Sequence, residues 1–496
     1  MILITYWVDL VKSYDVILIH PSRVIEKKRA PNRSLFLLSP MGLLAIADLC
    51  ESEGISVKII NYALEQVIDP QFSLETCLKT IDFKVCGIAL HWALHSYGAL
   101  EIARIVKKVN PNAKVVLGGF TASYFHDEIL KYYKSVDGVI KGEGEIPFLK
   151  YYKQVTQGQS LESVPNLSYR TTSQKIKHNP ISYVAKTLDD LNFSNLSLIH
   201  NVEKYVALGV KVMRMQFPLP VARGCPYNCP YCGGGSRSQM IINKRDKVLL
   251  RSPEKVVEDI RTLVDTYNAE GVFFGHGTYP GTFKYWRKLF KLIQKEKIDL
   301  GGDLEIWRLP FPKDMWSLYY KTFIPEKSSV SVCPRTLSPR VQQKIRETCD
   351  PTYYFPEHQI QDLIKQSISH QIVLRIWFTV GFPFQTRMDL LKDYYFVLKL
   401  ALKYGSSKSF PITVLNDLVT IIPGSPAFES PEKYDVSLTF NSFRQVVEMY
   451  KRAKFVIGGW NSVINYKNKY LSNIEMRVWN RIFNMTEIPM FITSGH

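Results

Sequence analysis

Short apolar runs alternate with amphipathic stretches through the first third of the chain. Buried parallel strands are predicted at residues 16–19, 57–60, 85–90, 115–117 and 138–140. Between them, Ser39 and Pro40 suit the N-cap and first turn of a helix that ends at Gly54, and residues 97–109 carry apolar side chains at helical spacing. This alternation of strand and helix predicts a doubly wound parallel, Rossmann-like sheet.

A second alternating region follows after a polar stretch. Ser252 and Pro253 begin a predicted helix with an apolar stripe that continues to Val264. Further strands are predicted within residues 271–277, 299–304, 329–332, 373–380 and 414–422. The pattern predicts an α/β class protein with two α/β units.

The pattern divides the chain into four parts. We expect a first α/β unit at residues 1–160, a linker at 161–215, a second α/β unit at 216–427 and a C-terminal helical extension at 428–496. Apolar positions between Phe440 and Tyr450 predict an amphipathic helix in the extension. We expect its apolar face to pack against the rest of the protein. Peripheral contact with a membrane surface is the alternative.

Charge and hydropathy narrow the class of protein. The chain of 496 residues has a net charge of +18, which suits anionic cofactors, acidic redox partners or an anionic lipid surface. No long basic block is interleaved with aromatic residues, so nucleic acid is not an expected partner. No apolar run reaches the roughly 18 residues of a membrane span, and no signal peptide is evident. We therefore expect a cytoplasmic protein.

Three of the eight cysteines lie in one short segment. Cys225, Cys229 and Cys232 have the spacing C-x3-C-x2-C and are followed at once by glycines. Three thiolates in one loop suit a [4Fe–4S] cluster with one iron left open for a small molecule. Zinc is the alternative, and it would need a fourth ligand such as Cys333 or Cys349. The remaining cysteines are scattered through apolar segments, as expected of reduced, buried thiols.

The cysteine spacing, with Tyr231 before the last cysteine, resembles the signature of the radical S-adenosylmethionine (SAM) superfamily. The resemblance implies a partial (β/α)6 barrel in which the cysteines hold a [4Fe–4S] cluster. SAM would bind the open iron and be cleaved to a 5′-deoxyadenosyl radical. Loops at the expected positions give a set of candidate SAM-binding residues: Tyr231, Gly275, His276, Gly277, Arg335, Gly381 and Pro383. The acid of the family's "GGE" loop is replaced here, and residues 423–426 resemble its "PGSP" turn.

The first unit resembles the cobalamin-binding domain attached to many radical SAM enzymes. Residues 117–123 and 137–145 are similar to that group's "GG" and "GEGE" loops, although the Asp-x-His-x-x-Gly motif is absent. Such domains bind ligands at the carboxyl ends of their strands. The candidate cobalamin-binding residues are Ser22, Gly42, His91, Trp92, Gly118, Gly119, Phe120, Thr121, Gly142 and Glu143. His91 and His95 are candidate cobalt ligands, although a lone histidine there is more often a hydrogen-bonded loop residue.

Together these resemblances imply a cobalamin-dependent radical SAM enzyme that modifies an unactivated carbon, with C-methylation as the main expectation. Ring or C–C bond formation on an isoprenoid or lipid without methyl transfer, RNA modification, and a non-catalytic cobalamin or iron–sulfur sensor remain alternatives. The expected partners are a small-molecule or lipid substrate and a one-electron reductant such as ferredoxin or flavodoxin. The C-terminal extension is expected to cap the barrel.

Overall fold

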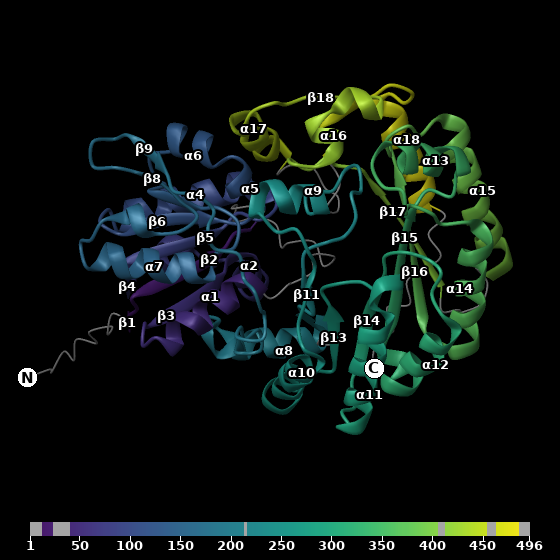
Figure 1. Ribbon diagram of the computed structural model, residues 1–496, viewed down its shortest axis with the longest axis horizontal. Helices are drawn as coiled ribbons and strands as arrows, with labels where there is room; N and C mark the ends of the chain where they lie inside the picture. Colours follow the sequence, from purple (N-terminus) through teal and green to yellow (C-terminus); the bar gives the residue numbers. More distant parts are fainter. Residues whose placement is uncertain (1–11, 23–39, 213–215, 405–411, 454–462, 486–496) are drawn as a thin grey trace, which may run out of the picture.

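The computed structural model describes residues 12–22, 40–212, 216–404, 412–453 and 463–485. Two lobes, each built on a mainly parallel sheet, lie side by side, and C-terminal segments lie across the top of both (Figure 1). The predicted α/β class and the order of a Rossmann-like unit followed by a partial barrel are confirmed.

The first lobe contains a seven-stranded sheet of order β3-β2-β5-β6-β7-β8-β9. Its strands are β2 (Val16–His20), β3 (Val57–Asn61), β5 (Val85–Ala89), β6 (Lys114–Gly118), β7 (Gly138–Ile140), β8 (Leu167–Arg170) and β9 (Ile176–His178). The first five are parallel, whereas β8 and β9 join antiparallel. Because β8 and β9 fall within the expected linker, we propose that the first unit extends beyond residue 160. A small parallel pair, β1 (Lys12–Ser13) and β4 (Ile81–Asp82), lies apart from this sheet.

Helices cover both faces of the first sheet. Side chains along β2 alternate between two cores: Val16 and Leu18 face one, and Ile17 and Ile19 face the other. The first core includes α1 (Met41–Ser52) and α7 (Glu145–Thr156), and the second includes α3 (Leu74–Lys79), α4 (Ser96–Val109), α5 (Phe120–Tyr124) and α6 (His126–Tyr132). Pro40 is the N-cap of α1, and Ser39 lies outside the described residues.

The second lobe is an open barrel of six parallel strands in sequential order. They are β10 (Gln216–Leu219), β13 (Gly271–Phe274), β14 (Gly301–Ile306), β15 (Ser329–Arg335), β16 (Val373–Val380) and β17 (Ile412–Leu418). The connecting helices are α10 (Pro253–Tyr267), α11 (Phe283–Lys295), α12 (Lys313–Thr322), α13 (Pro339–Thr348), α14 (Glu357–His370) and α15 (Arg387–Tyr404). As predicted, Ser252 caps α10, since its hydroxyl accepts a hydrogen bond from the Lys255 N–H.

The C-terminal extension contains β18 (Val436–Leu438), α17 (Phe443–Ala453), β19 (Tyr466–Asn468) and α18 (Asn473–Met485). The expectation that its amphipathic helix caps the barrel is wrong for α17, which packs on α4 of the first lobe. Phe443, Val446 and Val447 are buried there, so this face is not available to a membrane. In contrast, α18 packs on β16 and β17 of the barrel. No helix in the described part of the chain has the length and apolar character of a membrane span.

Candidate functional site

The three clustered cysteines lie in a loop at the carboxyl edge of the barrel, between the two lobes. The loop follows β11 (Ala222–Arg223), which pairs with β12 (Leu249–Leu250). Gly224 begins it with φ +99°, a conformation that favours glycine. The Cys232 N–H donates to the Cys229 carbonyl at 3.1 Å, so the loop turns tightly. All three thiols are free and half-buried.

The electrostatics of the loop fit an iron–sulfur cluster. Burial, together with charge on Cys229, raises the pKa of Cys232 to about 11. Burial likewise raises the pKa of Cys225, and charges on Cys232 and Cys229 add to that shift. A positive metal centre is therefore needed to hold these thiols as thiolates at neutral pH. The Gly234 N–H already donates to the Cys232 Sγ at 3.4 Å, as in a preformed ligand loop.

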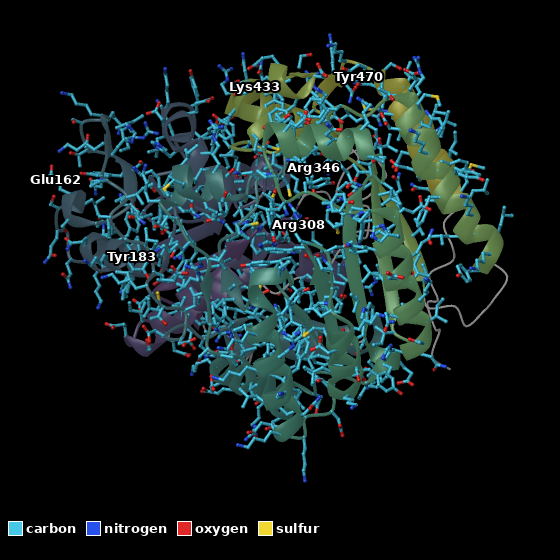
Figure 2. The ribbon with its side chains drawn as sticks, turned by 45° about the vertical axis from the view of Figure 1, so that its right-hand side comes forward. Glu162, Tyr183, Arg308, Arg346, Lys433 and Tyr470 are labelled. Carbon is cyan, nitrogen blue, oxygen red and sulfur yellow. The ribbon has the colours of Figure 1, made fainter. Side chains whose placement is uncertain are left out.

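Arg308 is a buried cation beside this loop, near the centre of the molecule in Figure 2. Its Nη2 lies 3.9 Å from the Cys229 Sγ and forms an ion pair with Asp350. Its guanidinium carbon lies 3.9 Å from the centre of the Tyr227 ring. Burial lowers the pKa of Arg308, but Cys229 and Asp350 more than reverse this and raise it. A permanent positive charge at this place stabilises an anionic cluster.

The zinc alternative needs a fourth ligand from elsewhere in the chain. Cys333 and Cys349 both lie within electrostatic reach of Cys229. Nevertheless, among the described residues no three histidine, cysteine or acidic side chains converge on one ion position. Three thiolates of a cubane cluster bind three different irons, so they need not converge in this way. The donor set therefore fits an iron–sulfur cluster better than a closed zinc site.

The turn after β17 supports the cysteine loop from behind. The Ile422 N–H donates to the Tyr231 carbonyl at 3.0 Å, and the Ala427 N–H donates to the Pro230 carbonyl at 2.8 Å. A Cβ at Gly233 would lie 2.6 Å from the Pro423 carbonyl oxygen. The "PGSP"-like turn is thus hydrogen-bonded to the cysteine loop. It also packs so closely on Gly233 that only glycine fits at that position.

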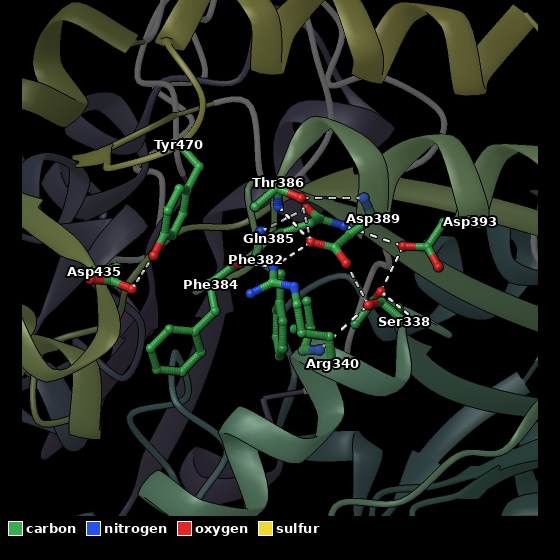
Figure 3. A network of polar contacts seen from close by, with 12 residues as sticks. Ser338, Arg340, Phe382, Phe384, Gln385, Thr386, Asp389, Asp393, Asp435 and Tyr470 are labelled. Atoms are coloured by element: carbon green, nitrogen blue, oxygen red, sulfur yellow. Dashed lines mark hydrogen bonds and ion pairs between the residues drawn. The ribbon is translucent and has the colours of Figure 1, made fainter.

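The candidate SAM loop after β16 is held by the buried network shown in Figure 3. The Gln385 Oε1 accepts hydrogen bonds from the Gly381 N–H (2.9 Å) and the Phe382 N–H (3.2 Å). Asp389 accepts from Thr386, from Ser338 and, in an ion pair, from Arg340. The α18 region closes over this loop, since a Cβ at Gly381 would lie 2.5 Å from the Met476 Sδ.

Asp393 makes this network sensitive to pH. It is 1% exposed, and burial raises its pKa to about 7 although Thr336, Leu337 and Gln385 donate to it. Because the folded protein binds this proton more tightly than the unfolded chain, the stabilisation is complete below the ordinary pKa of 3.8. It is lost as the pH rises through about 7.

We expect Asp393→Asn to flatten this dependence. Between pH 5 and 8, the unfolding free energy of the wild type should fall relative to that of the variant, by at most about 1.4 kcal/mol per pH unit. Denaturant unfolding at each pH measures the difference. Asp362→Asn, at a side chain that is 62% exposed on α14, is the matched control and should follow the wild type. Parallel curves for wild type and Asp393→Asn would contradict the assignment.

The loop after β13 brings three other candidates to the same edge. A Cβ at Gly277 would overlap the Trp307 ring at 2.2 Å, so glycine is required there. His276 is 2% exposed with its ring 4.2 Å from that of Trp307, and burial lowers its pKa to about 4. Both ring nitrogens of His276 are buried without a hydrogen-bond partner among the described residues, and its contact with SAM stays a prediction. Gly275 has nothing closer than 3.5 Å to an added Cβ.

Arg335 lies between the barrel interior and the cysteine loop. Its Nη1 donates to Asp417 (3.0 Å) and Thr379 (3.2 Å), and its guanidinium lies 5.3 Å from the centre of the Tyr231 ring. Its Nε has no hydrogen-bond partner among the described residues. This arrangement can bind a carboxylate such as that of SAM.

The carboxyl ends of β2, β5, β6 and β7 bring the candidate cobalamin residues together. The His91 carbonyl accepts from the Thr121 N–H (3.1 Å) and the Thr121 hydroxyl (2.9 Å), and the Ser123 hydroxyl accepts from the Gly142 N–H at 2.9 Å. A Cβ at Gly42 would meet no atom of the described residues within 4 Å. His91 packs on Trp92 and Phe120, with ring centroids 4.6 and 5.0 Å away. The glycine-containing loops after β6 and β7 are held by these hydrogen bonds. Because glycine has no side chain, a large flat ligand can approach their backbone closely.

Two histidines at this edge, His20 and His91, have pKa values that favour the neutral imidazole at neutral pH. Burial lowers the pKa of His20 and of His91 to about 4, and the positive charge of Arg223 contributes at His91. The His20 and His95 rings lie 5.2 Å apart. A neutral imidazole retains the lone pair that a cobalt ligand needs.

Gly119 has the strictest requirement in the candidate cobalamin site. Its φ is +109°, and an added Cβ would lie 2.8 Å from the His91 backbone N and Cα. We expect Gly119→Ala to destabilise the protein by about 1–3 kcal/mol and to reduce the cobalamin retained after desalting. Gly158→Ala has a smaller positive φ of +65° and meets no atom within 4 Å, so it shows the cost of a left-handed conformation without a clash. Equal effects of the two variants would contradict a steric role for Gly119.

Glu143 has a different role from the predicted contact with cobalamin. Its Oε2 accepts from Arg223 and from the Ala185 N–H, both at 2.9 Å, and its Oε1 accepts from Arg245 at 2.6 Å. Burial raises the pKa of Glu143, but Arg245 and Arg223 reverse this and hold the pKa below its usual value. Both oxygens are thus engaged by protein, and the side chain joins the first lobe to the segment before the cysteines.

Glu145 completes this interlobe bridge, which consists of Glu143, Glu145, Arg223 and Arg245. Arg223 donates to Glu145 at 2.6 Å, and both glutamates are at most 5% exposed. The sequence analysis missed both arginines and Arg308. The available signal was Arg223 immediately before the cysteine motif, but its partners lie about 80 residues away.

Comparisons with known proteins agree with this geometry. Family models match at residues 33–151 (B12 binding domain) and 219–307 (Radical SAM superfamily). An uncharacterized methyltransferase of Pyrococcus horikoshii, PH0819, is 24% identical over 405 residues, covering 81% of this chain and 80% of that protein. The anaerobic magnesium-protoporphyrin IX monomethyl ester cyclase of Rubrivivax gelatinosus is 28% identical over 175 residues, covering 35% and 30%.

A solved structure shares the whole fold. The radical SAM methyltransferase TsrM from Kitasatospora setae, with tryptophan and a SAM analogue bound, superposes with a TM-score of 0.67. The match covers 94% of this chain and 88% of TsrM at 14% identity, which establishes the fold. With both family domains present in this order, the chain combines a cobalamin-binding domain with a radical SAM domain, and the cofactors of this combination are a [4Fe–4S] cluster, SAM and cobalamin.

Proposed function

We propose that this protein methylates an unactivated carbon atom of its substrate in a cobalamin-dependent radical SAM reaction. The observation that carries the proposal is the interlobe bridge, because Arg223 joins the glutamates of the cobalamin-side loop to the segment two residues before Cys225. Because these short ion pairs connect the two cofactor sites, cofactors bound at both sites can react with one substrate. The similarity to proteins named as methyltransferases supports this choice of reaction.

Each candidate residue has a proposed task. When bound, the three cofactors supply reductive cleavage of SAM, hydrogen abstraction and a methyl donor. Cys225, Cys229 and Cys232 hold the cluster, and Arg308 balances its charge. Residues around Gly119 and His91 hold cobalamin. Arg335 orients the SAM carboxylate, and the loop at Gly381–Pro383 approaches the rest of SAM.

The test uses protein purified and reconstituted without oxygen, with iron, sulfide and hydroxocobalamin. The expected result is cobalamin absorption that survives desalting, together with 5′-deoxyadenosine and S-adenosylhomocysteine after SAM and reductant are added. SAM labelled in its methyl group should then label a product carbon once a substrate is supplied. A reconstituted protein that forms no 5′-deoxyadenosine would refute the proposal and leave a cofactor-binding sensor.

Ring formation is the second candidate, because three cyclases are among the similar proteins at 24–30% identity over parts of the chain. It predicts 5′-deoxyadenosine and a product two hydrogens poorer, without S-adenosylhomocysteine or transferred methyl label. Either reaction needs an electron donor. An acidic one-electron carrier such as ferredoxin or flavodoxin suits the net charge of +18.

A further inference from the structure

The inside of the barrel is polar and charged. The Arg375 Nη1 on β16 donates to the Asp303 Oδ2 on β14 at 2.5 Å, across the intervening strand β15. Because side chains alternate along a strand, Glu305 and Trp377 face the same interior. Their neighbours Leu304 and Ile376 belong instead to the apolar core on the other face of the sheet. We call the inward-facing set the lumen residues: Asp303, Glu305, Cys333, Arg335, Arg375 and Trp377.

The lumen is closed at its floor and open near the cysteine loop. Asp303 is 3% exposed and Ser329, its partner in register, is 2% exposed. Glu305, one layer higher, is half-buried, as are Cys333 and Trp377. Solvent therefore reaches the upper lumen. Charges on both Glu305 and Cys229 act on the Cys333 thiol, so the open part adjoins the cluster loop.

Asp417 of β17, which pairs with Arg335, adds a third acid to the lumen residues, so that three acids face two arginines. Asp303 pairs with Arg375 at 2.5 Å, and Asp417 pairs with Arg335 at 3.0 Å. Glu305 has no ion pair among the described residues, and its Oε2 accepts one hydrogen bond, from the Trp307 Nε1 at 2.7 Å. Burial and the charge of Asp303 raise the pKa of Glu305 by more than the Trp307 hydrogen bond and the charge of Arg335 lower it, so Arg335 compensates the carboxyl group only in part.

A second observation also indicates a missing donor. The Asp303 Oδ1 is buried without a hydrogen-bond partner among the described residues, one layer beneath Glu305. Buried acceptors of this kind are normally satisfied by a ligand or an ordered water. Glu305 and Asp303 both lie on β14. The indole of Trp377 and the thiol of Cys333 line the same interior space.

We propose that Glu305 binds a protonated nitrogen, an ammonium or amidinium group, of the substrate inside the barrel. The ammonium–carboxylate contact would anchor the substrate while its reacting carbon lies toward the cysteine loop. The use of this site in catalysis rests on the proposed function, whereas the preference for a cation rests on the lumen alone.

The experiment compares three ligands of similar shape on the reconstituted holoenzyme: phenethylammonium, 2-phenylethanol and 3-phenylpropionate. Calorimetric titration without oxygen should give the amine at least about tenfold higher affinity than the alcohol, with the carboxylate weakest. In Glu305→Gln the amine should lose about tenfold or more, while the alcohol changes by less than about twofold. Glu347→Gln, at a side chain 52% exposed on α13, is the matched control and should keep the amine preference.

The outcomes separate this inference from the proposed function. Wild-type protein without a preference for the amine, or a Glu305→Gln variant that retains it, would overturn the inference. The visible spectrum of the cluster and substrate-free formation of 5′-deoxyadenosine are recorded for every variant, so a misfolded protein is recognised. If the wild type forms no 5′-deoxyadenosine, the proposed function is refuted. The preference of Glu305 for a cation is still decided by the titration alone.

Discussion

Glu143→Gln is expected to lower the free energy of unfolding by about 3–5 kcal/mol, because it leaves Arg245 buried without its counter-charge. Arg245 is 6% exposed and has only the Ala185 carbonyl as another acceptor in the described structure. The variant should also slow methyl transfer more than about tenfold, since small displacements between reacting groups are costly. Denaturant unfolding and the formation of labelled product measure the two effects.

The control for the bridge is an exposed pair. Glu162→Gln removes the partner of Lys177 at the surface, where both side chains are at least half exposed, and should change stability by less than about 1 kcal/mol. Glu143→Gln should still assemble a cluster and retain cobalamin, because both carboxylate oxygens of Glu143 are engaged by protein groups in the interlobe bridge. If Glu143→Gln loses cobalamin while its stability and rates with added cobalamin match the wild type, Glu143 contacts the cofactor after all.

Cys229→Ala is expected to abolish formation of 5′-deoxyadenosine, with loss of most bound iron and sulfide. Two thiolates cannot hold the cluster, and the Arg308 contact to the Cys229 Sγ at 3.9 Å is lost with it. Iron analysis, the visible spectrum and chromatographic assay of 5′-deoxyadenosine measure the result.

Cys333→Ala and Cys349→Ala are the matched controls for this prediction. Both thiols are half-buried and lie near Cys229, but neither belongs to the cysteine loop. They should keep the iron content and the spectrum of the wild type. Loss of the metal in either control would show a fourth cysteine ligand and would revive the zinc alternative.

Local patterns predicted the elements well. Apolar runs located β2, β5 and β16, and the Ser252-Pro253 pair located the start of α10. Strand β8 was missed because Leu167-Ser168-Tyr169-Arg170 is short and alternates, which also fits a loop. The order of the motifs predicted the two lobes, since each motif follows its strand directly.

Pairings over long sequence distances could not be predicted in the same way. Glu143 and Arg245 are 102 residues apart, and nothing in either local sequence names the other as a partner. For the same reason an amphipathic stripe predicted α17 but not the surface that it covers. The pairing of acids and arginines inside the barrel could not be predicted either, because it depends on the register of strands that are far apart in the sequence.

The position of α17 limits how this protein can be recombined with its relatives. The helix lies more than 300 residues after α4 in the chain, yet the Phe443 N–H donates to the Glu128 carboxylate of the first lobe at 2.9 Å. An exchange of the N-terminal domain alone would leave Phe443, Val446 and Val447 facing a foreign surface. Chimeric enzymes built at this domain boundary should therefore aggregate unless α17 is exchanged together with the domain. The N-terminal domain and α17 therefore have to be exchanged together, although they are far apart in the sequence.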